Sequence, residues 1–309
     1  MRLNTKIKVV GVGGSGGNAV SRMMKYKIKG VELIAINADI QDLQRARAHR
    51  KVRIGRNLTK GLGAGMNPEI GKQAAEEQRE EIREVLKGSD MIFITCGLGG
   101  GCGSGASPVV AEIAKKLGAL TLAVVTRPFS FEGIQRMEIA KNSQRLLKAK
   151  VDTLISISND KLLSVLEPKT TVLNAFWICD EILRQAVQGI SDLIVLPGII
   201  NIDFADVKAI MKDSGSALFG IGKAKGPERA KEAARRALNS PLLDLSCKGA
   251  KGVLFNVSGG KDISLSEIDE AAKIITQEVS PEAKIIFGAI QNEKLKKGEI
   301  KVTVIATGF

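Results

Sequence analysis

The stretch Thr95-Cys96-Gly97-Leu98-Gly99-Gly100-Gly101-Cys102-Gly103-Ser104-Gly105 decides how the rest of this sequence is interpreted. It follows the apolar run Met91-Ile92-Phe93-Ile94, which predicts a buried strand. Beyond it, Ser107 and Pro108 are typical of a helix N-cap and first helical position, so we expect a helix over 107–117. Glycine lets successive N–H groups approach one ligand, and a helix start adds its positive dipole end. Strand, glycine loop and helix together predict a phosphate site; the alternative is a flexible surface loop.

The composition is that of a globular protein. The chain has 309 residues, 44% of them hydrophobic, which is enough for two domains. No apolar run reaches the ~18 residues of a membrane-spanning helix, and the first residues show no export signal. Four dispersed cysteines and one histidine offer no metal-ligand spacing; they are Cys96, Cys102, Cys179, Cys247 and His49. We therefore expect a reducing, cytoplasmic location and no metal held by these side chains.

The chain is strongly basic, with a formal net charge of +13. Such a field attracts nucleotides, nucleic acids or anionic membranes. The basic residues are spread along the sequence, and one Trp and one Tyr leave little for base stacking. We expect a solvated basic surface and no specific nucleic-acid partner.

A second glycine cluster lies near the N-terminus. The strand predicted at 6–10 leads into the motif G-x-G-x-x-G, whose glycines are Gly11, Gly13 and Gly16. The next predicted strand, 31–37, ends just before Asp39, where a dinucleotide-binding protein places its ribose-binding acid. A nicotinamide-dependent dehydrogenase is therefore one alternative.

A third cluster, Gly61-Leu62-Gly63-Ala64-Gly65, favours a different ligand. Three glycine clusters that follow strands suit a nucleoside polyphosphate better than a single pyrophosphate. The P-loop motif is absent, and Asn159-Asp160-Lys161 has the wrong order for the guanine motif of P-loop GTPases. A GTP-binding protein with this sequence would not have the P-loop fold.

Strands and helices alternate along the whole chain. Beyond those named, we expect strands at 120–126 and 153–158 and helices at 68–87 and 132–149, which predicts a parallel sheet covered on both faces. A long amphipathic helix runs from Leu173 to about Ile190. A second α/β unit follows, with strands at 216–223, 252–258, 284–290 and 300–307 and helices at 226–238 and 264–278. The expected organisation is a Rossmann-like nucleotide-binding domain (1–172), a connecting helix (173–192) and a smaller α/β domain (193–309).

A polar group stands at a loop-to-helix junction in the second unit. Asp203 is suited to the N-cap and Asp206 to the first turn, close behind Asn201. Capping alone would explain these carboxylates; a catalytic role is the alternative.

The motifs together resemble the tubulin/FtsZ family. Gly-Gly-Gly-Cys-Gly-Ser-Gly at 99–105 is similar to the tubulin signature Gly-Gly-Gly-Thr-Gly-Ser/Thr-Gly. Further segments, in order and over almost the whole chain, are similar to the bacterial cell-division members of this family: 13–20, 61–68, 128–133, 159–163, 185–193, 201–207, 215–222 and 250–260.

The resemblance implies GTP and GDP as ligands and assigns roles by position. The phosphate-binding residues would be Gly14, Ser15, Gly16, Gly17, Ala64, Gly65, Met66, Gly99, Gly100, Gly101, Cys102, Gly103, Ser104 and Gly105. The base and ribose would contact Asn18, Glu132, Arg136, Asn159, Phe176 and Asp180. The catalytic group would be Asn201, Asp203 and Asp206, which complete the site of a neighbouring subunit.

The implied activity is GTP hydrolysis coupled to head-to-tail polymerisation in the cytoplasm, at the division site. Magnesium is the implied companion ion, with a monovalent cation as a further option. Division-ring and membrane-anchor proteins would be partners if a C-terminal tail follows these residues.

Several positions depart from the family pattern. Cys102 stands for a threonine, and a thiol donates hydrogen bonds more weakly than a hydroxyl. Met66 stands for a small residue, Ala38 for a threonine and Arg127 for a lysine. These changes leave open a polymer that binds nucleotide but scarcely hydrolyses it.

Overall fold

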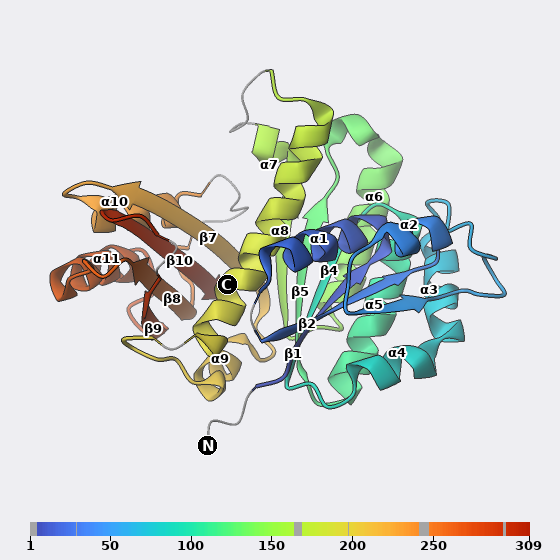
Figure 1. The fold of residues 1–309 in the computed structure, drawn as a ribbon, viewed down its shortest axis with the longest axis horizontal. Helices are drawn as coiled ribbons and strands as arrows, with labels where there is room; N and C mark the ends of the chain where they lie inside the picture. The colour runs from blue at the N-terminus through green and yellow to red at the C-terminus, as the bar shows by residue number, and fades with distance from the viewer. Residues whose placement is uncertain (1–4, 29, 164–168, 197, 241–246, 293–294) are drawn as a thin grey trace. The chain divides into compact units, whose positions relative to one another are not determined.

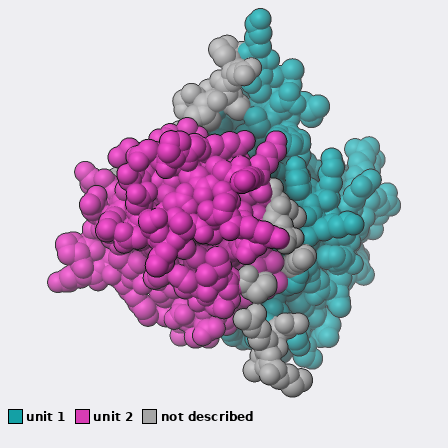
Figure 2. All heavy atoms as spheres, turned by 60° about the vertical axis from the view of Figure 1, so that its left-hand side comes forward, with its two compact units in different colours: residues 1–191 teal, residues 192–309 magenta. Residues whose placement is uncertain are grey.

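The computed structural model describes residues 5–28, 30–163, 169–196, 198–240, 247–292 and 295–309. The chain divides into two compact units, Met1–Ser191 (unit 1) and Asp192–Phe309 (unit 2), which are coloured separately in Figure 2. Within the described ranges, we find no helix that combines the length and the apolar character needed to cross a bilayer.

Unit 1 contains six parallel strands in the order β3-β2-β1-β4-β5-β6 (Figure 1). The strands are β1 (Ile7–Val12), β2 (Val31–Asn37), β3 (Arg50–Arg53), β4 (Met91–Gly97), β5 (Leu120–Arg127) and β6 (Thr153–Ser158). The helices are α1 (Gly13–Tyr26), α2 (Ile40–Arg45), α3 (Pro68–Glu77), α4 (Arg79–Leu86), α5 (Gly101–Lys116), η1 (Ser130–Glu132), α6 (Ile134–Lys148), α7 (Asn159–Leu163) and α8 (Val172–Val195), whose last residues extend into unit 2.

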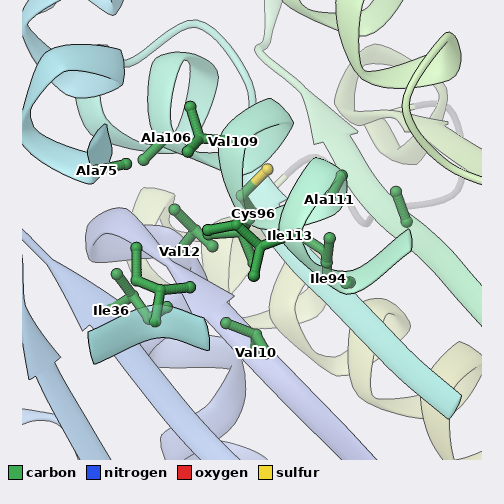
Figure 3. Close-up of a cluster of buried hydrophobic side chains, with 14 of the residues drawn as sticks. Val10, Val12, Ile36, Ala75, Ile94, Cys96, Ala106, Val109, Ala111 and Ile113 are labelled. Carbon is green, nitrogen blue, oxygen red and sulfur yellow. The ribbon is translucent and has the colours of Figure 1, made fainter. Parts of the chain in front are cut away.

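The sheet of unit 1 is buried on both faces, which is why its central strands are continuous apolar runs. On one face, side chains from the strands pack against α3, α4, α5 and α6 in a single cluster that includes Val10, Ile36, Ile94 and Val109 (Figure 3). On the other face, α1 covers β1, β2 and β4. Because parallel strands end at one edge, the loops that follow β1, β3 and β4 lie at the same edge.

Unit 2 is a second α/β unit with a mixed sheet. Its strands are β7 (Gly215–Lys225), β8 (Gly252–Gly259), β9 (Lys284–Gln291) and β10 (Glu299–Thr307), in the order β7-β10-β8-β9. β10 is antiparallel to both neighbours, and β8 and β9 are parallel. The helices are α9 (Phe204–Met211), α10 (Arg229–Leu238) and α11 (Leu265–Gln277). An apolar cluster joins one face of this sheet to α10 and α11.

The predicted start of α5 is wrong. The helix begins at Gly101 instead of Ser107, with Gly100 as N-cap, and Pro108 lies inside it. The glycines favoured a loop because they cost a helix stability. Here they permit close packing: a Cβ on Gly105 would lie 1.8 Å from the Pro68 carbonyl oxygen on α3. Contacts between helices therefore outweigh the local preference.

Other differences have local causes. The helix expected at 68–87 is broken at Gln78, which has non-helical dihedral angles and whose side chain accepts the Gly55 N–H. α1 starts at Gly13, inside the glycine motif. β3 was not predicted, because three of its four residues are Arg or Lys and do not form an apolar run. By contrast, the bounds predicted for β2 and β6 are confirmed.

Candidate nucleotide-binding site

Two helix starts meet at the carboxyl edge of the unit 1 sheet. α1 and α5 begin at or just beyond the ends of β1 and β4, which are parallel neighbours. Neither helix has a side-chain N-cap hydrogen bond or an acidic residue in its first turn. The two starts adjoin, since a Cβ on Gly13 would lie 2.9 Å from the Gly103 nitrogen. Unsatisfied N–H groups and two positive dipole ends therefore point to an anion at this position.

The third glycine cluster lies against the start of α5. A Cβ on Gly101 would be 2.8 Å from both the Ala64 carbonyl oxygen and the Asn67 nitrogen. Residues 64–67 form a tight turn closed by the Asn67 N–H and the Ala64 carbonyl, 2.9 Å apart. The two central residues, Gly65 and Met66, have φ angles of 51° and 60°. The structure therefore brings all three glycine clusters together, and Gly65 faces open space.

The Cys102 side chain is an unreactive thiol. Burial raises the pKa of its thiol to about 11, although the backbone N–H groups of Ala38 and Gly13 hydrogen-bond to the sulfur and oppose the shift. At neutral pH the side chain is therefore a protonated thiol held between the ends of β1 and β2. Its backbone N–H, in the first turn of α5, remains available to the anion site.

Glu132 and Arg136 lie beside the glycine loop. Glu132 accepts the Phe129 N–H at 2.9 Å and forms an ion pair with Arg136 at 2.8 Å. A Cβ on Gly99 would be 3.0 Å from the Arg136 carbonyl oxygen, so this segment packs on the loop. These side chains are positioned at one side of the anion site.

Asp180 on α8 faces α1. Its carboxylate is 3.1 Å from the Arg22 guanidinium, and the residue is 9% exposed. Burial raises the pKa of Asp180 to about 6, against the opposing effect of Arg22. Asn18 precedes Arg22 by one helical turn and is exposed on the same side of α1. A buried carboxylate with one oxygen in an ion pair can use the other to accept N–H groups of a ligand.

An aromatic surface and an unsatisfied amide complete this side. Phe176, one turn before Asp180, is 39% exposed and packs edge-on against Phe129 at 5.4 Å. The Asn159 side-chain oxygen is buried without a hydrogen-bond partner. Its neighbour Asp160 accepts the Ser130 N–H at 2.8 Å, which places α7 against η1.

These contacts form a closed ring of neighbouring residues within unit 1, which we call the circuit. It runs from α1 to α5, through Gly99 to Arg136 and Glu132, on through Phe129 to Phe176, and back through Asp180 to α1. Anion-binding N–H groups occupy one part of it, and stacking and hydrogen-bonding side chains another. This combination suits a phosphorylated nucleoside.

The structure also shows residues that sequence reasoning missed. Arg22 pairs with Asp180 and lies 5.0 Å from the ring of Trp177, the only tryptophan of the chain. Phe129 links Glu132 to Phe176. Only the helical spacing from Asn18 to Arg22 could have pointed to the arginine.

The three predicted catalytic residues belong to unit 2. Asn201 accepts the Gly198 N–H at 2.9 Å, Asp203 is the N-cap of α9, and Asp206 accepts the Asp203 N–H at 3.4 Å. The expected positions are therefore confirmed, with Asp203 as the N-cap and Asp206 in the first turn. Asn201 and Asp203 are exposed and Asp206 is half-buried, so their carboxylate and amide oxygens can reach a second molecule.

Metal-ligating side chains are sparse. Within the described ranges, no group of three or more His, Cys, Asp or Glu residues could hold a metal ion. An ion at this site would draw its ligands mainly from phosphate oxygens and water.

Comparison with known families identifies the two units. Residues 6–167 match the GTPase domain of the Tubulin/FtsZ family, and residues 215–309 match the C-terminal domain of the FtsZ family. The chain belongs to the tubulin/FtsZ family. The resemblance noted from the motifs and the predicted fold class are confirmed, unit 1 is a GTPase domain that binds GTP and GDP, and the dehydrogenase alternative is wrong.

Solved structures agree over nearly the whole chain. An empty FtsZ dimer from M. jannaschii is 48% identical, with a TM-score of 0.94 over 98% of this chain and 88% of that one. CetZ2 from Haloferax volcanii, described as a GTPgS-bound protofilament, is 22% identical, with a TM-score of 0.84 over 98% and 92%. CetZ1 from the same organism, a GDP-bound monomer, is 20% identical, with a TM-score of 0.86 over 99% and 94%. The CetZ likeness concerns the fold alone.

Proposed function

We propose that this chain is a GTPase that polymerises head to tail, and that each active site is shared between two subunits. The observation that carries the proposal is the adjoining pair of helix starts, which lack side-chain caps and acidic residues. The domain boundaries that we propose to accompany it are 1–172, 173–192 and 193–309.

The proposed nucleotide contacts follow the circuit of unit 1. The N–H groups of α1, of the 64–66 turn and of the 99–105 segment bind the triphosphate. Glu132 and Arg136 contact the ribose side. Asn18, Asn159 and Asp180 hydrogen-bond to guanine, and Phe176 stacks on it. Asp180 suits guanine because a carboxylate can accept both the ring N–H and the exocyclic amine.

Hydrolysis needs a positioned water more than covalent chemistry from the protein. We propose that Asp203 and Asp206 of the adjacent subunit orient and polarise this water, with Asn201 holding the loop through Gly198. When bound, magnesium, and a monovalent cation as a second option, would offset phosphate charge.

The position of the acidic residues supports their action on another molecule. Asp203 is exposed and Asp206 is half-buried at the start of α9, where one Asp206 oxygen accepts the Asp203 N–H. The 48% identical relative is an FtsZ dimer. A contact of the nucleotide face of one subunit with unit 2 of the next is heterologous, and such a contact extends into a filament when it does not close.

The cellular role is proposed from the family. A GTP-dependent filament of this kind would act as a cytoskeletal scaffold in the cytoplasm, at the division site. Division-ring and membrane-anchor proteins are the proposed partners, conditional on a C-terminal tail.

A mixing experiment tests the shared site. Asp206→Asn keeps a capping acceptor but removes the charge, and it should bind GTP yet release phosphate slowly. Gly100→Asp places a carboxylate where the phosphates bind, and it should lose GTP binding. Mixed in equal amounts, the two inactive variants should recover up to about a quarter of the wild-type rate, because half of the pockets meet half of the acidic loops.

The controls separate assembly from chemistry. Each variant alone gives the baseline, and circular dichroism reports folding. Light scattering with GTP measures polymer formation. Wild-type turnover by Asp206→Asn alone, or no recovery in the mixture despite assembly, would refute the shared site.

A second candidate is a polymer that binds GTP but hydrolyses it very slowly. Met66 favours it, because a side chain at positive φ replaces the small residue expected in the turn beside the phosphates. Phosphate release over many cycles per subunit would exclude this candidate. A single cycle or less with stable filaments would support it.

A further inference from the structure

One segment of this chain carries basic residues and no acidic ones. The segment from Leu43 to Pro68 contains seven of the 46 Lys and Arg residues of the chain. It contains none of the 33 Asp and Glu residues. This segment contains the edge strand β3 and the turns on either side of it. We expected the basic residues to be spread along the sequence, but Lys and Arg exceed Asp and Glu locally in this segment.

The cations of this segment lie on two faces of the sheet edge. On the face covered by α4, Arg50 pairs with Glu32 at 2.8 Å and Arg56 pairs with Glu81 at 2.7 Å. On the face covered by α1 and α2, Arg45, Arg47 and Lys51 are exposed and make no ion pair with any described carboxylate. Three cations without an ion pair to a described carboxylate therefore lie on this side of the sheet edge.

The fold holds these three cations next to a fourth. The Arg47 N–H donates to the Ser21 hydroxyl on α1 at 2.8 Å, and the Lys51 ammonium donates to the Gln44 carbonyl at 2.8 Å. Lys25 follows Ser21 by one helical turn and is exposed. We call Lys25, Arg45, Arg47 and Lys51 the basic corner; α1 and α2 can be located in Figure 1.

The basic corner is separate from the nucleotide site. α1 starts at the nucleotide site and runs away from it, so Lys25 lies about 18 Å along the helix from Gly13. Asp42, the acidic residue of α2, lies towards the start of α1: its carboxylate oxygen is 3.0 Å from the Cβ position of Gly14. GTP binding therefore does not account for the corner.

Protection of the sheet edge does not account for it either. Charged residues on an edge strand discourage pairing with other strands. Only Lys51 belongs to β3, whereas the other three cations come from α1, α2 and the turn that follows. Cations gathered from separate elements onto one surface point to a polyanion.

We infer that the basic corner binds the phosphate backbone of nucleic acid without reading its sequence. Arginine presents a planar fork of donors that matches phosphate oxygens, and two of the four cations are arginines. No exposed Leu, Ile, Phe or Trp lies among described residues 40–53, so the surface offers nothing to insert into a lipid bilayer. The neighbouring Tyr26 is exposed, and the Arg184 guanidinium lies 4.3 Å from its ring, so one face of the ring is already occupied. The proposed contact therefore depends on the four cations.

The test is a salt titration with a fluorescent 20-base-pair DNA duplex. Four phosphate contacts give a slope of about −3.6 in a plot of log affinity against log salt, or about a 150-fold loss between 50 and 200 mM. The triple variant Arg45→Gln/Arg47→Gln/Lys51→Gln should bind at least 10-fold more weakly at 50 mM. Its slope should fall to about −0.9, because one contact remains.

A matched control removes three charges elsewhere in unit 1. The control variant is Lys72→Gln/Arg83→Gln/Lys87→Gln. Lys72 lies on α3, Arg83 on α4 and Lys87 at the C-cap of α4, and each cation pairs with a glutamate three residues away. This variant should bind DNA within threefold of wild type. Both triple variants should bind GTP normally, and saturating GTP should leave DNA binding unchanged.

Three results would overturn the inference. The first is equal DNA affinity of the two triple variants. The second is displacement of DNA by GTP, which would place the DNA on the nucleotide site. The third is a pair of observations: the duplex does not bind at 50 mM salt, and wild type binds vesicles of 30% phosphatidylserine whereas the Arg45→Gln/Arg47→Gln/Lys51→Gln variant does not. The basic corner would then be a membrane contact.

Discussion

Gly100→Asp should stabilise the protein while abolishing GTP binding. Gly100 is the N-cap of α5, with φ −92° and ψ 167°, which any residue adopts. A side chain there meets no atom within 4 Å. Aspartate can therefore accept the free N–H groups of the first turn, which now have no side-chain acceptor. Capping and the helix dipole together should add about 0.5–1 kcal/mol to the free energy of unfolding.

The same carboxylate occupies the place that we assign to phosphate. Two like charges about 4 Å apart repel by ~4 kcal/mol at an effective dielectric constant of 20. This corresponds to a loss of about 10³-fold in GTP affinity. The loss should exceed that of Gly100→Ala, which adds a methyl group in open space and no charge. Gly100→Asn, which caps without a charge, should fall between them.

Trp177 provides the assay. It is the only tryptophan and lies 5.0 Å from Arg22, which pairs with Asp180. Its fluorescence should change on GTP addition and give the dissociation constant of each variant. Thermal unfolding should show a rise in Tm of about 1–3 °C for Gly100→Asp. If this variant binds GTP within threefold of wild type while its Tm rises, the phosphates do not lie at the start of α5.

Three further predictions concern single positions. Because the pKa of Asp180 is raised to about 6, its charged form should be lost as the pH falls from 7 to 5. The GTP affinity of wild type should drop over that range. The GTP affinity of Asp180→Asn should be lower than that of wild type at pH 7 and independent of pH. A GTP affinity of wild type that does not change with pH would contradict the role of the carboxylate. Linkage gives the opposite sign for the contribution of Asp180 to the stability of the nucleotide-free protein. The free energy of unfolding of wild type minus that of Asp180→Asn should rise as the pH falls from 6 to 4, since the folded state holds the Asp180 proton more tightly than the unfolded state. Met66→Gly should raise the free energy of unfolding by about 1 kcal/mol in urea titrations, because Met66 has a φ of 60°; an unchanged midpoint would show that the turn is unstrained. Gly105→Ala should lower that free energy by more than 3 kcal/mol, since its Cβ would lie 1.8 Å from the Pro68 carbonyl oxygen, and a loss under 1 kcal/mol would mean that α3 and α5 separate easily.

The sequence alone determined the fold class and most of the strands and helices, and it predicted a phosphate ligand. Buried parallel strands are continuous apolar runs, so 31–37 and 153–158 could be placed with their observed bounds. The helix predicted at 264–278 is α11, whose first turn Ser264 and Glu267 close as a capping box; such a cap depends on residues close in the chain. Two glycine clusters pointed to a phosphate ligand because each directly followed a predicted strand, whereas the third follows β3, which was not predicted.

Only the tertiary structure decided where α5 begins and what lies around Asp180. A glycine-rich segment has low helix propensity, and the packing of Gly101 and Gly105 against residues far away in the chain overrides it. The ion pair of Arg22 with Asp180 joins residues on two distant helices, and the basic corner joins α1, α2 and β3. Such contacts depend on how the elements pack, so no local pattern in the sequence reports them.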